Sequence, residues 1–165
     1  MWEDDIYIPI RCNRVIRSLE SIPGSRTVVE IGGSSMQVYY FSRTGRSKAI
    51  ADQLAARYQT TARMIDDHKN WDGKVNYMKA GAMALSGKTI PADYLEPDIT
   101  DEIVVVFPLW AGTMPPGVKN FVETVGKENI TAIITSLGST MKQRDGFKKI
   151  IDLVGEDITL PDIVE

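Results

Sequence analysis

Three runs of the sequence are apolar without alternation, and they constrain the fold more than any other feature. They are MQVYYF at 36–41, IVVVF at 103–107 and ITAIIT at 130–135, all rich in β-branched or aromatic residues. Continuous apolar runs of this length are typical of strands that are buried on both faces. Helical patterns over 48–58 and 118–125 lie between them. This order predicts an α/β fold, in which helices cover both faces of a parallel sheet and each crossover is right-handed.

Weaker patterns complete a five-stranded domain. TTARMI at 60–65 predicts a second strand, and the segment 67–100 is expected to be the crossover to the third strand, with a short helix inside it. Apolar residues at helical spacing predict a last helix over 147–154. DITLPDIV at 157–164 predicts the fifth strand, and Pro161 suits an edge position because proline cannot donate to a neighbouring strand.

Residues 1–35 form an N-terminal extension to the domain at 36–165. The extension contains a predicted helix at 11–22 and a predicted short strand at 27–31. Because no helical pattern follows the predicted fifth strand, one face of the sheet lacks its usual cover there. We hypothesise that the 11–22 helix supplies this cover, in its own chain or by exchange with a second copy in a homodimer.

Charge and composition exclude several functions. The chain of 165 residues has a formal net charge of -3, and its basic residues are scattered, so we expect no nucleic-acid partner. The single cysteine, Cys12, cannot form an internal disulfide. The first residues are acidic, and no apolar run approaches the roughly 20 residues that cross a bilayer, so we expect no membrane anchor. We therefore expect a cytoplasmic protein.

The loop FSRTGRS connects the first predicted strand to its helix. In an open parallel sheet such a loop lies at the ligand-binding edge, and the first N–H groups of the helix can bind a phosphate. The candidate phosphate-binding residues are Ser42, Arg43, Thr44, Gly45, Arg46 and Ser47. The loop lacks the GxxxxGK[ST] and GxGxxG patterns, which argues against ATP and NAD as primary ligands. The alternative interpretation is an ordinary capped helix start.

Two further loops follow the third and fourth predicted strands and should lie at the same edge. Their candidate binding residues are Pro108, Leu109, Trp110, Ala111, Gly112 and Thr113 in one, and Ser136, Leu137, Gly138 and Ser139 in the other. The indole of Trp110 offers a broad apolar face against which a flat heterocycle can stack. The alternative is that this side chain packs back on its own domain.

These paired motifs resemble those of the flavodoxin family, in which one strand runs into F-S-x-T-G-x-[TS] and a later one into P-x-W-x-G-x-x-P. The resemblance extends from about residue 36 to about residue 160. It implies a flavodoxin-like doubly wound sheet of order 2-1-3-4-5 that binds FMN non-covalently. The first loop would hold the phosphate, Trp110 would stack on the isoalloxazine, and the third loop would complete the site. That loop has no aromatic residue, which leaves Leu137 or Met141 to cover the other ring face.

The resemblance implies an FMN-binding redox protein that exchanges electrons with a partner protein or with a small-molecule donor or acceptor. The alternatives are an NAD(P)H- or quinone-linked FMN reductase and a flavin-free binding module with the same fold. Family members reorient a peptide near the flavin, and here the Ala111–Gly112 peptide is the corresponding hypothesis. We expect Trp71 to pack at the surface or an interface, and we do not expect His68 to bind a metal.

Overall fold

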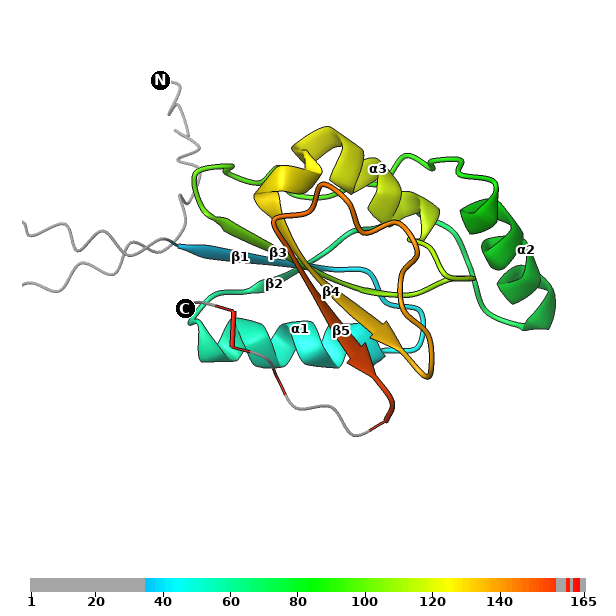
Figure 1. Cartoon of the computed structure of the whole chain (residues 1–165), viewed down its shortest axis with the longest axis horizontal. Coiled ribbons are helices and arrows are strands. Elements are labelled where there is room, and N and C mark those ends of the chain that lie inside the picture. The colour runs from blue at the N-terminus through cyan, green and yellow to red at the C-terminus, as the bar shows by residue number, and fades with distance from the viewer. Residues whose placement is uncertain (1–34, 157–159, 161, 164–165) are drawn as a thin grey trace, which may run out of the picture.

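The computed structural model describes residues 35–156, 160 and 162–163. They form one five-stranded sheet in the order β2-β1-β3-β4-β5, in which every neighbouring pair is parallel (Figure 1). The predicted fold class and strand order are therefore confirmed. The elements in chain order are β1 (Met36–Tyr40), α1 (Arg46–Arg57), β2 (Ala62–Met64), α2 (Lys74–Leu85), β3 (Glu102–Pro108), α3 (Pro116–Val125), the 3-10 helix η1 (Lys127–Asn129), β4 (Ile130–Ser136) and β5 (Lys149–Val154).

The sheet separates two apolar clusters. On one face α1 packs against the sheet through Ile50 and Leu54, and on the other face α3 packs through Val118 and Phe121. Strand β3 supplies alternate residues to both clusters and is fully buried over residues 103–107. Helix α2 lies beyond the carboxyl ends of the strands, where Figure 1 shows it at the right-hand end of the molecule.

The predicted helix over 147–154 is wrong, because this segment contains β5. Strand β5 pairs in register with β4, with Ile151 opposite Ile133. Ile150 packs with the α3 cluster, whereas Ile151 and Leu153 pack with the α1 cluster, so the side chains follow the two-residue period of a strand. A short apolar run fits both periods, and the open edge of β4 selects the strand. The predicted fifth strand at 157–164 is wrong at residues 160, 162 and 163, which lie in no strand.

The described part of the C-terminus helps to cover the sheet beside α1. Leu160 and Ile163 pack with the α1 cluster. The Ile163 N–H donates to the Tyr58 hydroxyl at 3.2 Å, and Asp162 pairs with Arg57 at 3.0 Å. These contacts cover part of the sheet face for which the sequence predicts no covering helix. The predicted helix at 11–22, the strand at 27–31 and the homodimer hypothesis lie outside the described residues.

Within the described part of the chain, none of the helices has both the length and the apolar character that crossing a membrane requires.

Candidate functional site

The first candidate element is the Gly45 loop, residues 41–47, at the carboxyl end of β1. The Phe41 N–H donates to the Val106 carbonyl at 3.0 Å, which ties the start of the loop to β3. Gly45 is the N-cap of α1 and has a φ of 87°, a left-handed conformation that glycine adopts without a Cβ clash. Its N–H donates to Ser42 Oγ at 3.1 Å. The chain therefore turns sharply from strand into helix at Gly45.

The amino end of α1 presents unpaired donors. Within the described part of the chain, the N–H groups of Arg46, Ser47 and Lys48 make no hydrogen bond, and no side chain caps the helix. The first turn also contains no acidic residue. Unpaired N–H groups and the positive end of the helix dipole together favour a bound anion. This end of α1 has the geometry of an anion site.

The side chains of the Gly45 loop fasten it to neighbouring elements. Ser47 Oγ is buried and lies 2.9 Å from Thr135 Oγ1 of β4. The Arg46 guanidinium donates to the Gly155 carbonyl just after β5. The Arg43 guanidinium lies 5.0 Å from the ring centroid of Tyr77 on α2. The hydroxyl of Ser47 is thus engaged with the sheet, while the backbone and the exposed Thr44 line the surface of the loop.

The second element is the Trp110 turn, residues 110–113. Trp110 and Thr113 exchange two backbone hydrogen bonds of 2.9 Å, and the two residues between them are left-handed, Ala111 at φ 50° and Gly112 at φ 83°. Two positive φ values in succession define a type I′ turn. The Ala111 carbonyl and the Gly112 N–H make no hydrogen bond within the described residues. The peptide at the tip of the turn is therefore unconstrained by partners.

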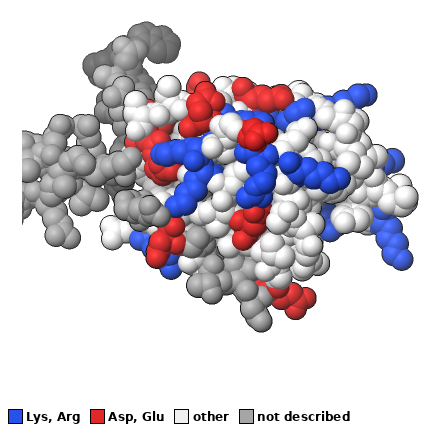
Figure 2. Space-filling model, in the orientation of Figure 1, with Lys and Arg blue, Asp and Glu red and all other residues white. Residues whose placement is uncertain are grey.

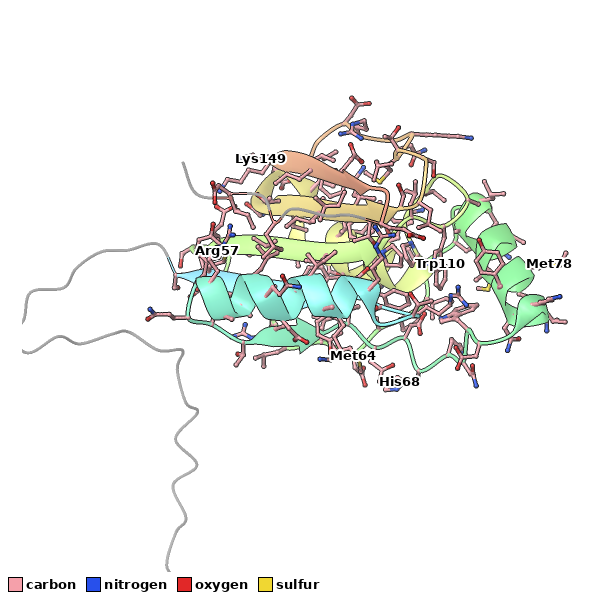
Figure 3. All side chains as sticks on the ribbon, turned by 90° about the horizontal axis from the view of Figure 1, so that it is seen from below. Arg57, Met64, His68, Met78, Trp110 and Lys149 are labelled. Carbon is pink, nitrogen blue, oxygen red and sulfur yellow. The ribbon has the colours of Figure 1, made fainter. Side chains whose placement is uncertain are left out.

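The indole of Trp110 is only 5% exposed. It packs edge-to-face against Phe41, with ring centroids 5.4 Å apart, and against Trp71, with centroids 5.2 Å apart (Figure 3 labels Trp110). The side chain thus packs back on its own domain, which is the alternative that the sequence left open. Its predicted role beneath a flat ligand stays a prediction, because the protein covers the indole in this structure.

The third element, the β4–β5 connection, reaches the same edge. Leu109 N–H donates to the Thr135 carbonyl at 3.0 Å, and Lys142 N–H donates to the Gly112 carbonyl at 3.2 Å. Leu137 is 73% exposed, and Gly138 and Ser139 are also exposed. The structure therefore brings the three predicted loops together. Met141 is 3% exposed and belongs to the core, so Leu137 is the accessible apolar side chain of this connection.

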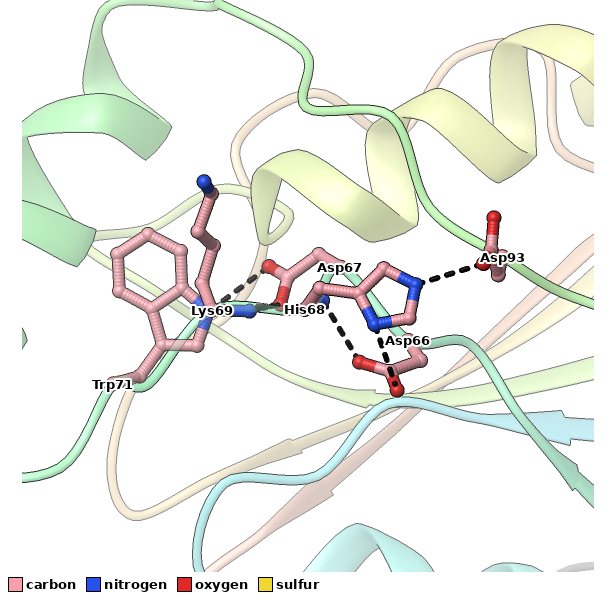
Figure 4. Close-up of polar contacts among 6 residues, drawn as sticks. All are labelled: Asp66, Asp67, His68, Lys69, Trp71 and Asp93. Atoms are coloured by element: carbon pink, nitrogen blue, oxygen red, sulfur yellow. Dashed lines mark hydrogen bonds and ion pairs between the residues drawn. The ribbon is translucent and has the colours of Figure 1, made fainter.

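Trp71 and Asp67 are structural residues that sequence reasoning missed. Trp71 is 9% exposed, so its predicted surface position is wrong. Its indole N–H donates to Asp67 Oδ2 at 2.9 Å (Figure 4). Asp67 is 4% exposed, and burial raises the pKa of its carboxyl although the Trp71 hydrogen bond opposes this shift. The polar neighbourhood of Trp71 in the sequence conceals its burial, because the tertiary partners that bury it are distant along the chain.

A hollow of about 310 Å³ opens beside the Gly45 loop. Ser42 and Arg43 line one side of it, and Lys69, Asn70 and Trp71 line the other. It therefore lies between the β1–α1 loop and the β2–α2 connection. Asp66, Asp67 and Asp72 also line the hollow, so it offers polar groups of both charges and does not select an anion.

His68 lies in the same β2–α2 connection, between two carboxylates (Figure 4). Its Nε2 is 2.7 Å from Asp93, and its Nδ1 is 3.4 Å from Asp66. The hydrogen bond with Asp93 and the charge of Asp66 raise the pKa of His68. Asp66 and Asp93 also exchange backbone hydrogen bonds of 2.9 and 2.8 Å. Among the residues that the structure describes, no group of three or more His, Cys, Asp or Glu is placed to hold a metal ion.

The sheet order and the helices on both faces define a flavodoxin-like α/β fold. The chain is similar to a flavoprotein from Lactobacillus acidophilus NCFM in complex with FMN, with a TM-score of 0.58, 16% identity, and coverage of 74% of this chain and 93% of that chain. It is also similar to a proposed flavoprotein from Bacteroides uniformis ATCC 8492, with a TM-score of 0.56, 20% identity, and coverage of 76% and 93%. No protein-family model and no curated protein sequence matches the chain. At these identities the likeness establishes the fold.

Proposed function

We propose that this chain binds FMN and acts as a redox protein. The observation that carries the proposal is the amino end of α1, where three backbone N–H groups are unpaired and no acidic residue opposes an anion. These groups fit the terminal phosphate of FMN, with Ser42, Arg43 and Thr44 beside it. The flavoprotein from Lactobacillus acidophilus, which shares the fold, is in complex with FMN. In our proposal the loop 42–47 holds the phosphate.

The ring end of the proposed site is formed by the loops 108–113 and 136–139. The exposed groups there are Ala111 at the tip of the Trp110 turn and the residues Leu137, Gly138 and Ser139. A ring stacked directly on Trp110 would require the indole to leave its contacts with Phe41 and Trp71. We therefore propose that the backbone of Ala111 and Gly112 is the first contact of the ring.

Bound flavin would supply the electron transfer itself, in steps of one or two electrons, and the chain would set its affinity and potential. The peptide between Ala111 and Gly112 is suited to this second task, because its carbonyl and N–H have no partner among the described residues. It can present either group to a bound ring. If Gly112→Ala and Gly112→Val both leave the reduction potentials of the bound flavin unchanged, this role is withdrawn.

The proposal includes electron exchange with a redox partner protein or with a small-molecule donor or acceptor. It is tested first by absorption spectroscopy of the purified protein before and after FMN is added, with unbound FMN removed by gel filtration. We expect flavin bands that elute with the protein at one FMN per chain. A protein that stays colourless and retains no added FMN would overturn the proposal.

A flavin-free binding module is the second candidate, and one observation favours it. The burial of Trp110 against Phe41 and Trp71 gives this residue a structural role that needs no ligand. The same titration separates the two candidates, because only the first predicts saturable uptake of FMN.

A further inference from the structure

The outer face of α2 exposes apolar side chains in a single stripe. Val75, Met78 and Leu85 are 67%, 74% and 64% exposed, and their spacing of three and seven residues places them along one side of the helix. Ala80 and Ala84 are buried and face the core instead. Figure 3 shows Met78 pointing away from the rest of the molecule. The helix therefore has an apolar inner side and a second apolar side that nothing in the described structure covers.

Between Asp72 and Asp93, the charged residues of the segment that contains this stripe all have one sign. The segment 73–92 contains Lys74, Lys79 and Lys88 and no Asp or Glu, although the chain as a whole has a formal net charge of -3. In Figure 2 the end of the molecule that α2 forms shows blue and white side chains without red ones. We call Val75, Met78, Leu85 and these three lysines the α2 face.

Helix α2, which carries the α2 face, lies next to the proposed flavin site. The ring of Tyr77 is 5.0 Å from the guanidinium of Arg43 in the Gly45 loop. On the same helix, a Cβ atom at Gly81 would lie 3.9 Å from the Cβ of Ala111 in the Trp110 turn. Helix α2 thus contacts both loops, and a molecule bound to its outer side would be separated from the carboxyl edge of the sheet by this one helix.

We propose that the α2 face is a docking surface for an acidic protein whose contact region is apolar at its centre. Large exposed apolar side chains in a continuous row mark interaction sites, and a row at spacings of three and seven residues is the pattern by which a helix anchors in a partner. The lysines favour a partner surface of negative charge, because complementary charge speeds association and surfaces of the same charge repel one another. The purpose of docking, electron exchange beside the flavin, rests on the proposed function; the docking itself does not.

Two other occupants fit the observations less well. A second copy docked through the same face in a two-fold dimer would bring its own Lys74, Lys79 and Lys88 against these, and like charges repel. Anionic lipid is recognised by basic clusters that typically hold four to eight Lys or Arg, whereas this face carries three lysines.

The test uses two fluorescent amphipathic peptides of about 14 residues. Both have leucines at the same helical spacing as the stripe, and all remaining positions are glutamate in one peptide and lysine in the other. Each is titrated with the full chain at low salt, and binding is followed by fluorescence anisotropy. We expect the acidic peptide to bind at least about tenfold more tightly than the basic one. The charge-reversed variant Lys74→Glu, Lys79→Glu, Lys88→Glu should invert this preference.

A second variant removes the stripe and keeps the charge. Val75→Ser, Met78→Ser and Leu85→Ser should weaken the acidic peptide at least about tenfold, because the apolar contacts are lost. A control for added negative charge is Gln53→Glu on the exposed side of α1, which is outside the α2 face and should leave binding unchanged. All of the altered residues are exposed, and a melting curve of each variant tests whether it is folded.

Three outcomes would overturn the proposal. The first is that both peptides bind with the same affinity, or that neither peptide binds. The second is binding to phosphatidylserine vesicles without binding to the acidic peptide, which would assign the face to lipid. The third is self-association that the stripe variant abolishes, which would assign it to a second copy. FMN uptake is measured on the same samples, so failure of docking with intact FMN uptake leaves the proposed function standing, and the reverse result leaves docking standing.

Discussion

The Gly45 loop and the Trp110 turn lie at the same edge of the sheet, but they differ in whether their backbone polar groups are hydrogen-bonded. The Gly45 loop leaves three consecutive backbone N–H groups unpaired at the start of α1. The Trp110 turn pairs Trp110 with Thr113 through two hydrogen bonds and buries its indole against two other aromatic rings. One loop is therefore open to a ligand, and the other is part of the packed core. Residue types alone do not distinguish them, because each combines glycine with threonine after a buried strand.

The largest effect expected from this contrast is on stability. Trp110→Ala should lower the free energy of unfolding by about 3–5 kcal/mol, because it removes a buried ring and leaves a cavity. Thr44→Ala at the exposed Gly45 loop should change it by less than about 0.5 kcal/mol. Urea denaturation measures both, and Trp110→Phe serves as a control that keeps part of the aromatic packing. A Trp110→Ala protein as stable as Thr44→Ala would mean that the turn is not packed as described.

The next effect concerns the open loop and the proposed function. Thr44→Asp places a carboxylate beside the unpaired N–H groups of α1, where it would compete with a phosphate and repel it. We expect FMN affinity to fall by about tenfold or more, and the free energy of unfolding to change by less than about 1 kcal/mol. Fluorescence titration with FMN measures the first quantity and urea denaturation the second. Thr44→Ser is the matched control and should bind FMN like the unaltered chain. If Thr44→Asp bound FMN with undiminished affinity, the proposal that this loop holds the phosphate would be wrong.

The sequence predicts most of the fold because the central strands are buried on both faces. Residues 103–107 form a continuous apolar run rich in valine, which is typical of a strand that is covered on both faces, and these residues are fully buried in the middle of the sheet. At the edges the signal weakens. The segment KIIDLV of β5 has apolar residues that fit a helix as well as a strand, and it is pairing with β4, a contact between distant residues, that decides.

The candidate site is predictable in position but not in side-chain detail. The order of strands and helices places the loops 41–47, 108–113 and 136–139 at one edge, and the structure brings them there. The burial of Trp110 depends on Phe41 and on Trp71, which comes from a different loop. No local pattern encodes such a contact. Asp67 binds Trp71 only four residues away, but it also lies against Gly117 of α3, a neighbour that is distant along the chain.

Asp67 offers a smaller and pH-dependent test of the closed region. Burial raises the pKa of its carboxyl, so the folded chain binds this proton more tightly than the unfolded chain, in which the usual value is 3.8. Its contribution to stability is therefore full below that value and is lost as pH rises through the folded pKa. Asp67→Asn cannot ionise and keeps an acceptor for the Trp71 N–H. The unfolding free energy of the unaltered chain minus that of the variant should decrease from about pH 4 to about pH 7. A flat difference would contradict this account.

The smallest effect is expected at His68, which lies one residue from the packed Asp67 but is itself exposed. Its pKa is raised chiefly by the hydrogen bond to Asp93, so its pairing with Asp93 and Asp66 stabilises the folded chain below the ordinary value of 6.5 and ceases to do so as pH rises through the folded pKa. His68→Asn removes the imidazole and still tolerates the left-handed backbone at this position, where φ is 53°. The melting temperature of the unaltered chain should exceed that of His68→Asn slightly at about pH 5.5, and this difference should vanish by about pH 8.5. Because solvent screens exposed charges, we expect a smaller pH dependence here than at Asp67. If His68→Asn changed the pH dependence of stability as strongly as Asp67→Asn, the description of His68 as exposed and Asp67 as packed would be wrong.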